Sequence, residues 1–107
     1  LGDVYKRQDF VKPNKIYREA SEVEREAILD LRDKLANYNG DLDAESLQSV
    51  VFSCGRERFD PLRKWFQALY EILLGASQGP RFGGFIALYG IEETIALIDS
   101  ALEGKFL

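Results

Sequence analysis

Apolar residues recur along most of the chain at spacings of three and four positions, which is the period of an amphipathic α-helix. Five segments show this period, and recognisable start and stop signals bound nearly all of them. No segment competes as a strand. The pattern therefore predicts an all-α protein, and the short connections between the helices predict a compact bundle of about five helices.

The first predicted helix begins after Ser21, which forms a possible capping box with Glu24 three residues later. It ends before Asn39 and Gly40, two residue types that favour the left-handed turn at a helix end. Its predicted apolar face consists of Val23, Ala27, Ile28, Leu31, Leu35 and Tyr38.

The second and third predicted helices carry clear start signals. The second begins at Asp43, whose carboxylate can accept hydrogen bonds from free amides of the first turn, and it ends at Gly55. Its apolar stripe is Leu47, Val50, Val51 and Cys54. The third has Asp60 as its cap and Pro61 at the first helical position, and Gly75 is its predicted left-handed stop. Its stripe is Leu62, Trp65, Phe66, Leu69 and Leu73.

The last two predicted helices are bounded by glycines. The fourth starts at Gly79 and Pro80 and is interrupted at Gly90, with Phe82, Phe85, Ile86 and Tyr89 predicted to lie on one side. The fifth has two glutamates in its first turn, where the helix dipole favours anions, and it ends near Gly104. Its apolar residues are Ile91, Ile95, Ile98 and Leu102.

The chain divides into three predicted parts. Residues 1–8 mix apolar and charged side chains without a period, and we interpret them as a non-native or disordered leader. Residues 9–20, which include Pro13, are interpreted as an extended lead-in. Residues 21–107 form the predicted helical domain. The chain contains no Met, so we interpret it as the back part of a longer reading frame.

Composition narrows the range of functions. Hydrophobic residues make up 46% and charged residues 30% of the sequence, the balance of a folded globular protein. No run of about 18 apolar residues and no secretion signal is present, so we expect neither membrane nor secretion. The single cysteine, Cys54, fits a cytoplasmic protein and is expected to be buried. The absence of His removes the commonest proton shuttle and metal ligand, so we expect no catalytic or metal site within this chain.

The middle of the sequence differs from the rest in charge. The net charge is −4, but residues 53–90 hold five basic and three acidic residues and also most of the aromatic ones. Alternating cations and rings is how proteins hold unstacked bases and phosphates. Burial in the core is the simpler interpretation for four of the rings, namely Trp65, Phe66, Phe82 and Phe85. For Tyr70 and Tyr89 a core role and a binding role are both open.

The segment around Pro80 is the most specific local indication of a binding site in the sequence. A helix start at Pro80 would gather free backbone amides and the positive end of the dipole, which makes a potential anion site. Arg81 in that first turn is disfavoured by the dipole, so a phosphate, a base edge or an intramolecular carboxylate such as Glu71 should compensate. Gly83 and Gly84 within the same short helix imply a close approach, either by another helix or by a ligand backbone.

One run of residues resembles a known family. Its members are Leu62, Arg63, Trp65, Phe66, Ala68, Leu69, Tyr70, Glu71, Leu73, Leu74, Gly75, Gln78, Gly79, Pro80, Arg81, Phe82, Gly83, Phe85, Ile86, Ala87, Leu88, Tyr89, Gly90, Glu93 and Thr94. This run resembles the end of class I lysyl-tRNA synthetases. The upstream part, which begins with Pro13, Lys15, Tyr17 and Arg18, is similar to the same family more loosely. Pro61 departs from the family pattern, in which an acidic residue is commoner.

The resemblance implies a division of labour. The helical part would form a cage around the anticodon loop of tRNA(Lys). A separate catalytic domain with the Rossmann fold would join lysine to that tRNA with ATP and Mg²⁺. That domain carries HIGH and KMSKS signatures, and neither occurs in this chain. The chain alone is therefore expected to be inactive and to hold no cofactor, although the resemblance implies that its parent protein is a lysine--tRNA ligase. Its expected partners are the anticodon loop and the parent's own catalytic domain, without DNA or membrane.

Five side chains are our candidates for tRNA contact under this resemblance. Gln78 and Arg81 are assigned to the anticodon, and Arg56, Arg58 and Lys64 are assigned to phosphates. Two alternatives stay open beside it. One is the anticodon-binding domain of a related glutamyl-tRNA synthetase, and the other is a helical protein-interaction module with no nucleic-acid role. A free-standing enzyme is a third and weaker alternative, because no pairing of a nucleophile with a base is visible.

Overall fold

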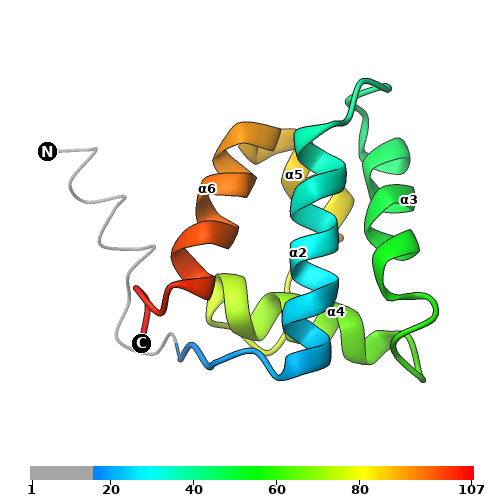
Figure 1. Cartoon of the computed structure of the whole chain (residues 1–107). Coiled ribbons are helices and arrows are strands. Elements are labelled where there is room, and N and C mark those ends of the chain that lie inside the picture. Colours follow the sequence, from blue (N-terminus) through cyan, green and yellow to red (C-terminus); the bar gives the residue numbers. More distant parts are fainter. Residues whose placement is uncertain (1–15) are drawn as a thin grey trace, which may run out of the picture.

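The computed structural model describes residues 16–107, and all of its regular structure in this range is helical (Figure 1). The elements are α2 (Glu22–Ala36), α3 (Ala44–Gly55), α4 (Arg63–Leu69), the π-helical turn η1 (Tyr70–Leu74), α5 (Phe82–Tyr89) and α6 (Ile91–Leu102). Because η1 continues α4 without a break, the described residues form five helices, and the predicted all-α bundle is confirmed. The predicted leader at residues 1–8 and the first part of the predicted lead-in lie outside the described residues.

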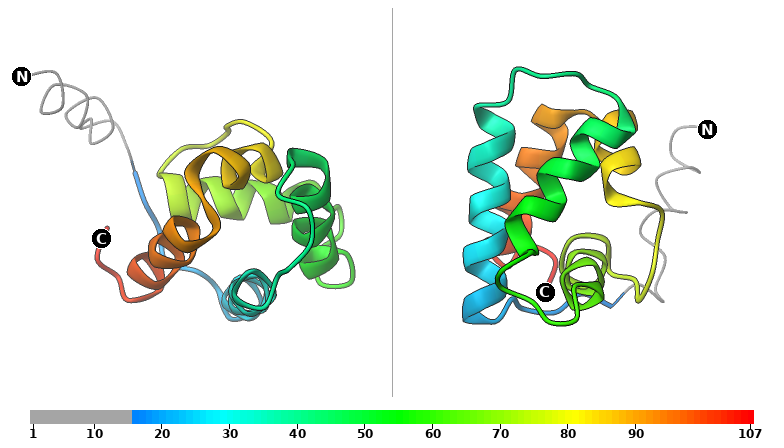
Figure 2. Two further views of the ribbon diagram at one scale, coloured as in Figure 1. Left: turned by 90° about the horizontal axis from the view of Figure 1, so that it is seen from above. Right: turned by 90° about the vertical axis from the view of Figure 1, so that its right-hand side faces the viewer.

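The helices pack around one centre. Helix α2 contacts α3 on one side and α6 on the other, and the joined helix α4–η1 crosses beneath them (Figure 1). Helix α5 packs mainly against α3, on the side away from α2, as Figure 2 shows from two further directions. The C-terminal end returns to the start of the described chain, where the rings of Tyr17 and Phe106 pack with their centroids 4.8 Å apart.

The core draws on every helix. Its fully buried large side chains are Ile28, Leu31, Leu35, Leu47, Val51, Trp65, Leu69, Ile72, Leu73, Phe82, Ile86 and Ile98. The indole nitrogen of Trp65 donates a hydrogen bond of 2.8 Å to the Val51 carbonyl, which satisfies its one donor and ties α4 to α3. Cys54 is buried as predicted, and burial raises the pKa of its thiol to about 11.

Helix boundaries that rest on local capping are confirmed. The Ser21 hydroxyl accepts from the Glu24 amide while the Glu24 carboxylate accepts from the Ser21 amide, which is the predicted capping box. The Asp43 carboxylate accepts from the Ser46 amide at the start of α3. Gly75 ends η1 with φ 66°, in the left-handed region that only glycine enters at little cost.

Two boundaries predicted from prolines are wrong. Helix α4 begins at Arg63 and not at Pro61, because the Lys64 and Trp65 amides bond to carbonyls three residues back and form a turn before the helix. Asp60 consequently caps no helix. Helix α5 begins at Phe82, and Arg81 has extended backbone with ψ 131°.

Two smaller predictions also need correction. Helix α2 ends at Ala36, so Tyr38, which was assigned to its apolar face, follows the helix. Val23 lies outside the core with 41% of its surface exposed, although it was assigned to the apolar face. Tyr89, for which a core role and a binding role were both open, is 46% exposed and lies outside the core.

Candidate nucleic-acid interface

Three of the five candidate contact residues lie where α3 passes into α4. Arg56 and Arg58 are exposed in the turn that follows α3, and Lys64 is exposed in the first turn of α4. The Arg58 guanidinium is already engaged, because its Nη1 bonds to Asp30 Oδ2 at 3.2 Å and to the Cys54 carbonyl at 2.8 Å. Arg56 and Lys64 form no ion pair with the residues that the structure describes. Of the three, these two therefore have no described ion pair to break before they could meet an anion.

The other two candidates, Gln78 and Arg81, lie in the segment between η1 and α5. This segment is held against Tyr70, whose hydroxyl donates a hydrogen bond of 2.6 Å to the Pro80 carbonyl. Gly79 lies against one edge of the same ring, since a Cβ at that position would be 3.2 Å from both Tyr70 Cδ1 and Tyr70 Cε1. Both candidates are exposed. The structure thus gives Tyr70 a positioning role and leaves Gln78 and Arg81 at the surface.

The predicted anion site at Pro80 is wrong in its geometry. The helix starts after Arg81, so Arg81 is not in the first turn. One of the first amides of α5, that of Gly83, is buried and donates to Gln48 Oε1 at 2.6 Å. Glu71 does not compensate Arg81 either, because its carboxylate is paired with Arg18.

Gln48 makes a buried structural contact that was not predicted from the sequence. Its side chain is 7% exposed and supplies the acceptor that the start of α5 needs. A buried, unpaired amide would cost about 1–3 kcal/mol, so this bond fixes α5 against α3. The available signal was a polar residue between Leu47 and Val51 on the apolar side of its helix.

Cations without a carboxylate partner concentrate in the predicted basic region. Within residues 16–107, Arg18, Arg32, Lys34, Arg58 and Lys105 are paired with carboxylates. The cations without such a pair in that range are Arg25, Arg56, Arg63, Lys64 and Arg81, and all but Arg25 fall between positions 53 and 90. Arg63 was not among the candidate residues, and the structure adds it. A cation without an internal partner can neutralise a phosphate without first breaking an ion pair.

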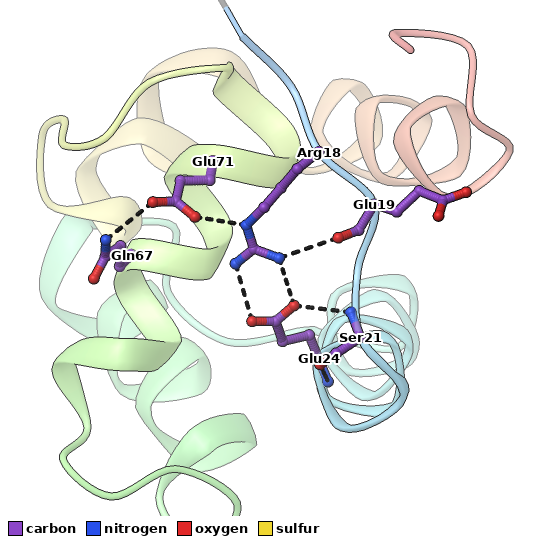
Figure 3. Close-up of polar contacts among 6 residues, drawn as sticks. All are labelled: Arg18, Glu19, Ser21, Glu24, Gln67 and Glu71. Atoms are coloured by element: carbon purple, nitrogen blue, oxygen red, sulfur yellow. Dashed lines mark hydrogen bonds and ion pairs between the residues drawn. The ribbon is translucent and has the colours of Figure 1, made fainter.

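A second polar cluster, centred on Arg18, was also missed (Figure 3). Arg18 forms two hydrogen bonds with the Glu24 carboxylate at 2.8 and 3.0 Å and one with Glu71 Oε1 at 2.6 Å. The other oxygen of Glu71 accepts from Gln67 at 3.0 Å. Arg18 lowers the pKa of both carboxyls and has its own pKa raised. The cluster joins the segment before α2 to both α2 and α4–η1, so its role is to hold these parts together.

No group of three or more metal-ligating side chains occurs among residues 16–107. No helix in that range is long and apolar enough to cross a bilayer.

Comparison with known proteins found clear relatives. The chain is 72% identical over 99 residues to a lysine--tRNA ligase of Roseobacter denitrificans, a match that covers 92% of this chain and 19% of that protein. It is 40% and 43% identical over 95 residues to lysine--tRNA ligases of Rickettsia felis and Rickettsia bellii, which covers 88% of this chain. The chain spans about a fifth of the length of these relatives. No family model matches it, and no solved structure is significantly similar to it.

Proposed function

The chain is homologous to one segment of lysine--tRNA ligases, and we propose that this segment binds the anticodon loop of tRNA(Lys) in a class I ligase of the cytoplasm. The observation that carries the proposal is the identity of 72% across 92% of the chain to a protein that acts on lysine and tRNA. The remaining four fifths of such a ligase would activate lysine with ATP and Mg²⁺. This chain would contribute binding and not catalysis.

The surface cations support the proposal. Arg56, Arg63, Lys64 and Arg81 are exposed and have no carboxylate partner within residues 16–107. They belong to a region with a charge of +2 inside a chain of net charge −4. Since the overall field of the chain repels RNA, binding must depend on this region. The candidate Gln78 is exposed, and Arg58 would contribute less than these cations because it is paired with Asp30, a carboxylate that it shares with Lys34.

Salt dependence of tRNA binding tests the proposal. Neutralised phosphates release counterions, so the affinity of the 107-residue chain for tRNA(Lys) should fall linearly on a log–log plot against salt concentration. Replacing Lys64 with Ala should make that slope shallower by about one unit, since one phosphate contact is lost. Lys105→Ala is the matched control, because it removes the same charge from a cation that is paired with Glu103. Absence of binding even at low salt would refute the proposal.

A further inference from the structure

The outer face of α5 has an unusual composition. The positions i, i+3, i+4, i+7 and i+8 that form this face are Arg81, Gly84, Phe85, Leu88 and Tyr89. They include one cation and no acid. Leu88 is 93% exposed and Tyr89 is 46% exposed, whereas Phe82, Gly83 and Ile86 on the inner face are buried. An apolar helix face with a single cation at one end is open to a ligand with both apolar and anionic parts.

The ring of Tyr89 is held in place by its aromatic neighbours. It stacks on Phe85 with centroids 4.9 Å apart and an interplanar angle of 22°, and Phe85 stacks in the same way on buried Phe82 at 5.2 Å. Its hydroxyl has no hydrogen bond to any described residue, in contrast to the Tyr70 hydroxyl. Because these stacked rings already fix its position, the Tyr89 ring loses little conformational entropy when a ligand stacks on it.

Gly84 lies on the side of this face that is next to α3, and packing does not require glycine at this position. A Cβ at Gly84 would have only an ordinary contact of 3.9 Å with Ala44 Cβ, so the fold has room for a side chain. Gly83, by contrast, faces the backbone of α3 and has no room. Glycine within a helix costs about 1 kcal/mol relative to Ala. Gly84 is half-buried and the fold does not require glycine there, so its presence favours a ligand that approaches α5 closely.

The charged residues at the two ends of α5 differ in sign, so they favour one orientation of an anionic ligand along the helix. Arg81, at the start of α5, has no carboxylate partner among residues 16–107. At the other end, Glu92 and Glu93 lie in the first turn of α6. Phosphates are consequently favoured beside Arg81 and disfavoured beside Tyr89. A base can occupy the Tyr89 end because its ring is uncharged.

We propose that the outer face of α5 binds unpaired bases of an RNA loop, with one base stacked on Tyr89 and the neighbouring phosphate beside Arg81. The proposal rests on the proposed function and adds the site and the chemistry of the contact. A paired helix cannot use this site, because its base faces are covered by their neighbours in the stack.

The test uses the 107-residue chain and a hairpin with the anticodon arm of tRNA(Lys), labelled in its loop with 2-aminopurine, whose fluorescence falls when it stacks on a ring. Wild type should quench the label and bind the hairpin more tightly than a fully paired duplex of the same length. Tyr89→Leu keeps an apolar contact with Phe85 but removes the ring, so affinity should fall by about 5-fold or more and quenching should be lost. Tyr89→Phe should behave as wild type.

Two further variants separate a ligand contact from a structural effect. Gly84→Ala should raise the melting temperature and yet weaken hairpin binding, a combination that a purely structural glycine would not give. Leu29→Ala, at an α2 position with a similar exposure of 41%, should leave binding unchanged. Unchanged affinity and quenching in Tyr89→Leu, with Arg81→Ala still weakening binding, would overturn this inference and leave the proposed function standing. Failure of the wild-type chain to bind either the hairpin or whole tRNA would overturn both.

Discussion

Arg18 is the residue on which three parts of the molecule depend. Its guanidinium binds the carboxylates of Glu24 on α2 and Glu71 on η1, while its own backbone belongs to the segment before α2. The planar group fits this task because it offers several donors in a fixed geometry, which an ammonium does not. With 39% of its side chain exposed, the arginine is partly screened by water, so its contribution is moderate.

Replacing Arg18 with Gln should lower the free energy of unfolding by about 1 kcal/mol near neutral pH. The loss of stability caused by the substitution should become smaller as the pH falls into the acid range. Because Arg18 lowers the folded-state pKa of Glu24 and Glu71, the stabilisation is present above their ordinary pKa of about 4.5 and disappears as the pH falls through the lowered values. Urea unfolding of wild type and variant at a series of pH values measures this difference.

Arg63→Gln is the control for this experiment, since Arg63 is exposed and has no carboxylate partner within the described range. It should change stability by less than about 0.5 kcal/mol at every pH. If the stability difference between wild type and Arg18→Gln were to persist unchanged into acid, the ion pairs would not be its source.

The distance between partners in the sequence decides which residue contacts could be predicted. The capping box of Ser21 and Glu24 was visible because the two residues are three positions apart. The pairing of Arg18 with Glu71 spans 53 positions and exists only once α4–η1 packs beneath α2. Glu71 was instead considered as a partner for Arg81, which is nearer in sequence, and that interpretation was wrong.

At the scale of the elements, the type of start signal separates right predictions from wrong ones. A side chain that accepts a hydrogen bond from a helix amide, as Asp43 does, specifies where the helix begins. Proline fixes only its own φ, which suits a turn or an extended segment as well as a helix. Both helix starts that were predicted at prolines, Pro61 and Pro80, accordingly fall two residues too early.

The two adjacent glycines of α5 should respond in opposite ways to substitution by Ala. A Cβ at Gly83 would lie 2.5 Å from the Ala44 carbonyl oxygen and 2.6 Å from Gln48 Cα, so Gly83→Ala should push α5 away from α3 and cost about 2 kcal/mol or more. Gly84→Ala should stabilise the chain by about 0.5–1 kcal/mol, because helix propensity improves and nothing is displaced. Thermal or urea unfolding measures both. Equal effects of the two substitutions would contradict the close approach of α3 and α5 at Gly83.

At the scale of the whole molecule, the fold was predictable because each helix carries its own apolar stripe. The binding surface was predictable only in outline. The local charge of residues 53–90 indicated where anions could bind, but which cations stay available depends on tertiary ion pairs. Arg58 is paired with Asp30 from α2, a carboxylate that it shares with Lys34, while Arg63, which was not a candidate, has no carboxylate partner in the range that the structure describes. Tyr70 and Tyr89 could likewise not be separated until the packing of the segment before α5 was known.

The central claim is that this chain recognises the anticodon end of tRNA(Lys). Its most direct test compares two hairpins cut from that tRNA, the anticodon arm and an acceptor-stem minihelix, by fluorescence anisotropy with the 107-residue chain at low and at physiological salt. We predict that the anticodon arm binds at least about tenfold more tightly, a difference of about 1.4 kcal/mol. Equal affinity for the two hairpins, or tighter binding of the minihelix, would contradict the claim.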